Sequence, residues 1–428
     1  MADRLTAAVA EARARYTDAH PRSRELAARA ALVLPGGNTR SVLHIEPFAF
    51  RVVGADGAVL HDADGHAYVD LLGDYSAGLL GRGSTVAEVI RDVLDRGWSY
   101  GAMSEPETTF AEAVVARFPS VDQVRFTNSG TEANVMALMT ARHATGRGRV
   151  IVFEHGYHGG PLYFGHGGEP LRIPFDYAVL PYNDVAAVEA ELASRGDDIA
   201  CVLVEPMLGS GGCIPGDPAF LAALRRLTTD VGAVLIFDEV MTSRLAVGGA
   251  QELLGITPDM TTLGKYLAGG LSFGAFGGRQ DLMAAFDPAR GGLTHGGTFN
   301  NNAFTMAVGA AVGGALVDAG TLAAVNDLGD RLRAGLDARF AASSLDFCAT
   351  GWGSILNIHP VAGPVRSPAD LTDADPRWRE LFFHDLLAAG FYLAPRGYMA
   401  LTMDVSADDT GRFLDAVEQF CDRRRDLA

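Results

Sequence analysis

Lys265 is the only lysine in a chain of 428 residues with 35 basic side chains, all the others being arginine. It lies in the stretch TTLGKYLAGG at 261–270. Arginine keeps its proton, whereas a desolvated lysine can lose its proton and attack a carbonyl carbon. Because glycines and apolar residues flank Lys265, we expect its amine to act as a nucleophile toward a carbonyl group.

Asp238 ends the apolar run VLIF at 234–237, which predicts a buried carboxylate at the end of a strand. A buried carboxylate stays ionised only beside a cationic or hydrogen-bonding partner. The protonated ring nitrogen of a cofactor would serve, and so would one of the many arginines. The sequence leaves both partners open.

A candidate phosphate site lies in RFTNSGTEANVMALM at 125–139, where a strand is expected to end at Thr127 and a helix to begin near Thr131. Ser129, Gly130 and Thr131 offer backbone N–H groups and two hydroxyls at a helix N-terminus, an arrangement that favours phosphate. An ordinary helix cap is the alternative.

A stacking site is indicated by FEHGYHGG at 153–160, where Tyr157 can lie against a flat ring and the glycines allow close approach. His155 and His158 raise the question of a metal, but no third ligand follows at a suitable spacing. We therefore predict no metal site.

These residues need a scaffold that brings strand ends together. Short apolar strands expected at 123–127, 149–153, 200–205 and 233–239 alternate with helical segments, which predicts a mostly parallel sheet flanked by helices. A small meander is expected at 48–70, and further strands at 354–360 and 398–403. We predict a large α/β domain at 76–310 and a smaller α+β domain formed by 1–75 and 311–428.

Composition narrows the class of protein further. A net charge of −17 argues against nucleic acid as a partner, because phosphate binding requires a concentrated basic surface. The four cysteines are scattered, which favours a reducing compartment. The apolar run at 306–317 is too short to span a bilayer, so we expect no membrane partner and a cytoplasmic protein.

A phosphate cradle, a stacking tyrosine, a buried acid and a single lysine together predict a site for pyridoxal 5'-phosphate. The carbonyl that Lys265 would attack is then the aldehyde of this cofactor.

The runs NSGTEAN (128–134), VEPM (204–207), 237–270 and GTFNNN (297–302) resemble class III aminotransferases. The resemblance implies a fold-type I pyridoxal phosphate enzyme and a homodimer with shared active sites. It also implies that Lys265 bonds the cofactor, that Asp238 pairs with the pyridine nitrogen, and that Thr298 reaches the phosphate of the neighbouring subunit. The resemblance further implies that Ser129, Gly130 and Thr131 bind the phosphate and that Tyr157 contacts the ring. It gives Glu205 an acidic role near the cofactor.

Within this family, PGGNTRSVL (35–43) and APRGY (394–398) resemble the transaminases of β-amino acids, β-phenylalanine among them. That resemblance implies a β-amino acid donor, a keto acid acceptor such as 2-oxoglutarate or pyruvate, and carboxylate anchors at Arg40 and Arg396, with Tyr75 lining an aromatic pocket. From position alone, a surface salt bridge is the alternative for Arg40.

Two other functions stay open. Glutamate-1-semialdehyde aminomutases are close relatives, although the segment 161–177 is shorter than their usual mobile gate. A non-catalytic regulatory protein that binds the cofactor would need a DNA-binding domain and a basic surface, and we see neither in this sequence.

Overall fold

The structure is a computed structural model, and it describes residues 2–290 and 292–427. The chain forms two compact units, one made of residues 1–83, 327–365 and 371–428 and the other of 84–326 and 366–370. The boundaries lie at 83/84 and 326/327, whereas the sequence predicted 75/76 and 310/311.

The second unit is built on a seven-stranded sheet with the order β4-β12-β11-β10-β7-β5-β6. Its strands are β4 (Gln123–Thr127), β5 (Arg149–Phe153), β6 (Asp176–Leu180), β7 (Ile199–Val204), β10 (Val234–Asp238), β11 (Met260–Gly264) and β12 (Gly274–Gly278). β12 runs antiparallel to both of its neighbours, and the other pairs are parallel. The predicted mostly parallel sheet is confirmed. β7, β10 and β11 are buried throughout, as expected for strands covered on both faces.

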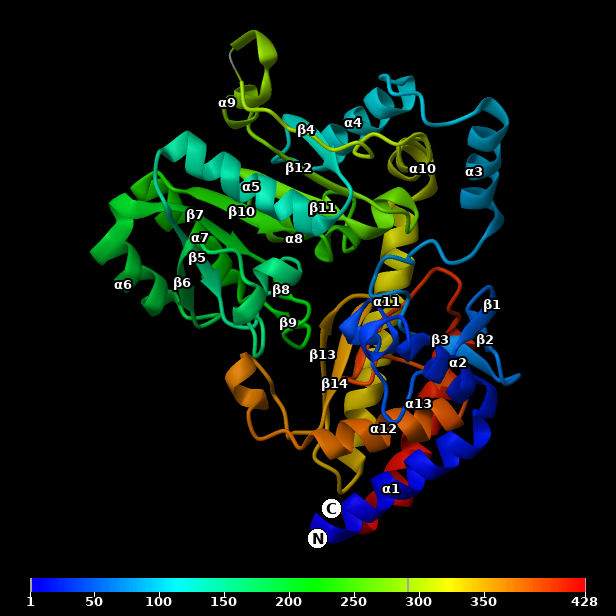
Figure 1. Ribbon diagram of the computed structural model, residues 1–428. Helices are drawn as coiled ribbons and strands as arrows, with labels where there is room; N and C mark the ends of the chain where they lie inside the picture. The colour runs from blue at the N-terminus through cyan, green and yellow to red at the C-terminus, as the bar shows by residue number, and fades with distance from the viewer. Residues whose placement is uncertain (1, 291, 428) are drawn as a thin grey trace. The chain divides into compact units, whose positions relative to one another are not determined.

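Helices cover this sheet (Figure 1). Those of the second unit are α3 (Ser84–Arg96), α4 (Glu105–Arg117), α5 (Gly130–Thr145), α6 (Val185–Arg195), α7 (Pro218–Val231), α8 (Gly249–Leu254), α9 (Gln280–Met283) and α10 (Ala303–Ala311). Alanines of α5 pack in one buried cluster with Val150, Val152 and Ile236. On α7, Phe220 meets Phe153 of β5 edge-to-face at 5.2 Å. A two-stranded ribbon of β8 (Met207–Leu208) and β9 (Ile214–Pro215) completes the unit.

The apolar run at 306–317 forms most of α10 and a π-helical turn at Val312–Leu316. A methyl group at Gly309 would lie 2.1 Å from the ring of Phe110 on α4, so glycine allows these helices to pack closely. Among the described residues, no single helix is long and apolar enough to cross a membrane, and the bent pair Ala303–Leu316 and Ala319–Ala342 meets that criterion only jointly, by length and composition.

The first unit holds two small sheets, of order β1-β2-β3-β15 and β13-β14-β16. Their strands are β1 (Val52–Asp56), β2 (Val59–Asp62), β3 (Ala67–Asp70), β13 (Cys348–Trp352), β14 (Ile355–His359), β15 (Phe391–Tyr392) and β16 (Tyr398–Ala400). β1, β2 and β3 pair in antiparallel fashion, as expected for a meander.

The helices at the two chain ends belong to this unit. They are α1 (Ala2–Ala19), α2 (Pro21–Ala31), α12 (Pro376–Ala388) and α13 (Ala407–Arg424), and α11 (Ala319–Ala342) contains the boundary at 326/327. The N-terminal segment breaks at His20, because the following proline disfavours helical geometry in the residue before it.

Candidate active site

The carboxyl ends of β4, β5, β7, β10 and β11 point the same way, because β12 runs antiparallel to both β4 and β11 while the remaining pairs are parallel. Ligands of open α/β sheets gather at this end. The predicted site residues Ser129, Tyr157, Glu205, Asp238 and Lys265 each lie at, or within a few residues of, one of these strand ends.

Asp238 ends β10 and is buried. Its Oδ2 atom accepts hydrogen bonds from Nδ2 of Asn134 at 2.8 Å and from Nδ1 of His158 at 2.7 Å. Its Oδ1 atom accepts from the backbone N–H of Val240 at 3.0 Å. An amide and an imidazole therefore hold this carboxylate.

Asn134 is itself held in one orientation. Its Oδ1 atom accepts a hydrogen bond of 2.7 Å from the hydroxyl of Thr262, the residue of β11 that pairs with Asp238 across the sheet. The side chain of Asn134 therefore links α5, β10 and β11 around the carboxylate. Asn134 was not among the site residues predicted from sequence, although NSGTEAN places it one helical turn after Gly130, on the side of α5 that faces the strand ends.

The first turn of α5 has the geometry of a helix cap and also leaves N–H groups that can bind an anion, the two alternatives that the sequence left open. The hydroxyl of Ser129 caps the helix by accepting from the backbone N–H of Glu132 at 3.2 Å. The N–H groups of Gly130 and Thr131 belong to the first turn, where a helix offers no acceptor of its own. These two groups can bind an anion while Ser129 caps the helix.

Glycines bring this turn against the neighbouring loops. A methyl group at Gly130 would lie 2.8 Å from Val240, and one at Gly264 would lie 3.1 Å from the same side chain. Val240 lies two residues after Asp238, and Gly264 directly precedes Lys265. The start of α5 and the segment that carries Lys265 therefore both pack against the side chain of Val240, next to the buried Asp238.

Lys265 directly follows β11 and is half-buried. Its backbone φ is +57°, a left-handed conformation that costs an L-residue about 1–2 kcal/mol. Glycine would adopt this conformation without strain, so the presence of lysine here points to a function of its side chain.

Glu205 follows β7 and is buried, close enough to Asp238 and His158 to interact with their charges. Its two carboxylate oxygens accept from the backbone N–H groups of Tyr157 at 2.9 Å and Gly209 at 3.0 Å. The pKa of Glu205 is raised to about 7, chiefly by burial; the charge of His158 and the two backbone hydrogen bonds oppose this rise, and the charge of Asp238 adds to it. Glu205 therefore fixes the loop that carries Tyr157 and His158.

Two predicted residues of the second unit lie at its surface. Tyr157 is 46% exposed, and its ring meets Tyr163 edge-to-face at 5.7 Å, which leaves ring surface accessible. Thr298 lies exposed in the turn that precedes α10.

The predicted substrate residues Arg40, Tyr75 and Arg396 gather within the first unit. The guanidinium carbons of Arg40 and Arg396 lie 5.4 Å and 5.5 Å from the centre of the Tyr75 ring. That ring stacks on Tyr398 at 5.5 Å. Arg40 also pairs with Asp74 at 2.8 Å, so the salt bridge offered as its alternative role is present.

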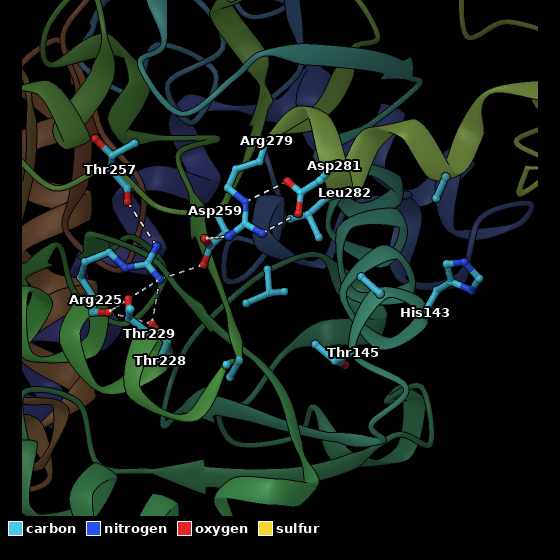
Figure 2. A pocket seen from close by; sticks show the side chains of 15 residues that line it. His143, Thr145, Arg225, Thr228, Thr229, Thr257, Asp259, Arg279, Asp281 and Leu282 are labelled. Atoms are coloured by element: carbon cyan, nitrogen blue, oxygen red, sulfur yellow. Dashed lines mark hydrogen bonds and ion pairs between the residues drawn. The ribbon is translucent and has the colours of Figure 1, made fainter. Parts of the chain in front are cut away.

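A different cavity, of about 780 Å³, lies at the amino ends of the parallel strands (Figure 2). In it, Asp259 accepts from Arg225 at 2.9 Å and from Arg279 at 2.6 Å. Arg279 also pairs with Asp281 at 2.7 Å. Because these charges already neutralise one another, we place the chemistry at the carboxyl ends of the strands.

The donor set fits the groups of pyridoxal phosphate. Asp238 offers a buried carboxylate for a protonated ring nitrogen, the start of α5 offers N–H groups for a phosphate, and Lys265 offers an amine for an aldehyde. Fold and site together define a fold-type I pyridoxal phosphate enzyme.

Comparison with known proteins identifies the family. Residues 43–164 and 169–350 match the family model of the class-III aminotransferases. The chain therefore belongs to the class III aminotransferases, which use pyridoxal phosphate.

Individual relatives cover nearly the whole chain. The chain is 47% identical over 414 residues to a beta-phenylalanine transaminase from Variovorax paradoxus, covering 96% of this chain and 95% of the relative. It is 40% identical over 407 residues to a glutamate-1-semialdehyde 2,1-aminomutase from Sorangium cellulosum, covering 90% of this chain and 92% of the relative.

Solved structures agree with these relatives. A beta-phenylalanine aminotransferase from Variovorax paradoxus superimposes with a TM-score of 0.97 at 46% identity, over 99% of both chains. An omega-transaminase from Sphaerobacter thermophilus gives a TM-score of 0.87 at 33% identity, over 94% of this chain and 97% of that chain.

Proposed function

We propose that this enzyme moves the amino group of a β-amino acid, with an aromatic β-phenylalanine-like donor, to a keto acid such as 2-oxoglutarate or pyruvate. The observation that carries this proposal is the 47% identity to a beta-phenylalanine transaminase over 96% of the chain.

Each site residue has a proposed task. Asp238, held by Asn134 and His158, keeps the ring nitrogen protonated, while Gly130 and Thr131 bind the phosphate through their N–H groups with Ser129 beside them. When bound, pyridoxal phosphate supplies an aldehyde that bonds the amine and a ring that draws electrons from the adjacent carbon.

Lys265 has two proposed tasks. Its amine holds the cofactor before the substrate arrives. Once the substrate amine has replaced it, the Lys265 amine would act as a base that takes the proton from the amine-bearing carbon and delivers it to C4′ of the cofactor. Tyr157 offers its exposed ring for stacking, and Glu205 keeps the Tyr157 loop in place.

The cluster around Tyr75 supports a β-amino acid donor. Such a donor has one more carbon between its amine and its carboxylate than an α-amino acid has, so its carboxylate needs an anchor in a different place. Arg40 is proposed as this anchor and Arg396 as the anchor for the second carboxylate of 2-oxoglutarate, because a guanidinium grips a carboxylate bidentately. Tyr75 offers an aromatic surface between them.

A homodimer is part of this proposal. Trp98, Tyr100, Met103 and Phe299 of the second unit are all more than half exposed, and exposed apolar groups of this kind are typical of protein interfaces. Thr298 lies beside Phe299, and we propose that it reaches the phosphate site of the neighbouring subunit. The four cysteines, all within the described residues, are buried and form no disulfide, which supports a reducing cytoplasmic location.

An aminomutase is the second candidate, because of the 40% identity to a glutamate-1-semialdehyde 2,1-aminomutase. It would convert one substrate without an added keto acid.

A panel of α-, β- and ω-amines, each tested with 2-oxoglutarate, with pyruvate and without an acceptor, separates the two candidates. We expect the highest kcat/KM for an aromatic β-amino acid and turnover only with an acceptor, with Lys265→Ala as the inactive control. Preference for an α-amino acid, or turnover of glutamate-1-semialdehyde without an acceptor, would overturn the β-amino acid proposal.

A further inference from the structure

A compact group of nitrogen and oxygen donors lies in the first unit, where two turns meet. One turn separates α1 from α2 and carries His20. The other joins β2 to β3 within HDADGHAY, where Asp62 ends β2, His66 lies in the turn and Tyr68 lies in β3. His20, Asp62 and Tyr68 are buried. The His66 side chain is 37% exposed, which gives the group access to solvent.

Four donor atoms of this group lie close together, at separations that range from hydrogen-bond lengths to the spacing of ligands around one small cation. From Oδ2 of Asp62, Nδ1 of His66 lies at 2.9 Å, the Tyr68 hydroxyl at 3.0 Å and Nε2 of His20 at 3.4 Å. The Tyr68 hydroxyl lies 2.8 Å from Nε2 of His20. Zinc bonds of 2.0–2.1 Å in a tetrahedron separate the ligand atoms by about 3.3 Å.

Backbone groups already fix the orientation of two of these side chains. Nδ1 of His20 lies 2.7 Å from the carbonyl oxygen of Tyr16, so it carries the proton and donates. Oδ1 of Asp62 accepts from the N–H groups of Asp64 at 3.0 Å and His66 at 2.8 Å. Metal-binding histidines usually donate their second N–H in this way, and metal-binding carboxylates are likewise held by hydrogen bonds.

Hydrogen bonds link these side chains in the absence of an ion. Nδ1 of His66 can donate to Oδ2 of Asp62 at 2.9 Å, and the Tyr68 hydroxyl bridges Oδ2 of Asp62 and Nε2 of His20. Oδ2 of Asp62 and Nε2 of His20 face each other at 3.4 Å. A bound cation would replace these hydrogen bonds, with His66 presenting a lone pair at Nδ1 in its other neutral tautomer.

We propose that His20, Asp62 and His66 bind a zinc ion, with the Tyr68 hydroxyl at the fourth vertex. Two imidazoles and a carboxylate form a donor set that zinc uses in proteins. Asp64 already joins the two turns by accepting from the N–H groups of Arg22 at 2.6 Å and Ser23 at 2.9 Å. The ion would fasten the start of α2 to the β2–β3 turn.

The test uses the full-length holoenzyme, stripped of metal with a chelator and then titrated with Zn²⁺ or Co²⁺. His66→Gln removes one ligand at a half-exposed position and should leave the fold intact. His61→Gln is the matched control, since His61 is exposed and lies on the same strand pair. Circular dichroism and the visible absorbance of the bound cofactor check that all three proteins are folded.

We expect about one Zn²⁺ per wild-type and His61→Gln chain by elemental analysis, and visible tetrahedral absorption with Co²⁺. His66→Gln should lose the absorption and bind zinc at least tenfold more weakly, in line with the loss of one ligand. Zinc should raise the Tm of the wild type and leave that of His66→Gln unchanged.

Two results would overturn the proposal. Equal binding by wild type and His66→Gln would show adventitious surface sites. No binding by the wild type would leave the hydrogen bonds among these four side chains as the explanation of the geometry. Neither result bears on the aminotransferase proposal, because its activity assays need no added zinc.

Discussion

His158 donates from Nδ1 to Oδ2 of Asp238 at 2.7 Å, and both side chains are buried. The histidine lies in the loop after β5 and the aspartate at the end of β10, so the segments that follow two different strands hold one carboxylate in place. His158 therefore acts through Asp238, as a positioning residue.

Asp238→Asn should lower kcat/KM by roughly 30- to 1000-fold, which corresponds to about 2–4 kcal/mol for a lost charge-assisted interaction. His158→Phe should cost less, roughly tenfold, because the carboxylate keeps its bond from Asn134. The checks are steady-state kinetics and the dissociation constant of pyridoxal phosphate. Asp281→Asn, at an exposed carboxylate, is the control. Wild-type kinetics in Asp238→Asn would show that this acid has only a structural role.

Lys265→Arg tests why this one lysine is present. Arginine keeps the positive charge but cannot lose its proton, so this variant should be as inactive as Lys265→Ala. Borohydride treatment of the wild-type holoenzyme should leave the cofactor covalently attached to the peptide that contains Lys265. Attachment elsewhere in the chain, or activity in Lys265→Arg, would contradict the assignment.

Elements with continuous apolar runs could be predicted closely from sequence. QVRFT and RVIVF are β4 and β5 with the predicted bounds. β12 was missed because GAFGG lacks the bulky residues typical of strands. The structure gives the reason for this composition, since a methyl group at Gly274 would lie 2.1 Å from the carbonyl oxygen of Ser129.

Contacts between side chains from distant segments could not be predicted from local sequence patterns. The strand end identified Asp238, but its bonds to Asn134 and His158 join residues from three separate elements. A salt bridge was the alternative role for Arg40, but nothing in the sequence identified Asp74 as its partner. Such pairs depend on the tertiary arrangement, and local spacing does not encode them.

Thr298→Ala tests the proposed dimer. If the hydroxyl of Thr298 completes a phosphate site on the neighbouring subunit, its loss should raise the dissociation constant of pyridoxal phosphate by roughly 5- to 10-fold, as for one neutral hydrogen bond. Residual turnover at saturating cofactor should be close to that of the wild type. Sedimentation measures the assembly, and a fully active monomer at high dilution would contradict a shared site.

Arg40→Ala separates substrate binding from a surface salt bridge. We expect kcat/KM to fall by roughly 30- to 1000-fold for a β-amino acid and to change little for the matched amine without a carboxylate. Asp74→Asn provides the complementary test, because it releases Arg40 from its internal partner and should lower KM for the acid. Equal losses on both substrates would mean that Arg40 supports the fold alone.

Glu205 should make the stability of the enzyme fall with rising pH. Burial raises its pKa from 4.5 to about 7, so the folded state holds this proton more tightly than the unfolded state does. The resulting stabilisation is fully present below about pH 4.5 and is lost as pH rises through about 7. Within this window the free energy of unfolding should decrease by at most about 1.4 kcal/mol per pH unit on account of this group.

Urea unfolding from pH 5 to pH 8 measures this contribution. Glu205→Gln, which cannot ionise, should show a flatter pH profile than the wild type, whatever its absolute stability. The exposed Glu154, one strand away on the same edge of the sheet, supplies the control Glu154→Gln, which should keep the wild-type slope. If Glu205→Gln and wild type lose stability in parallel across this window, Glu205 is already ionised at its lower end, and its two backbone hydrogen bonds outweigh the effect of burial.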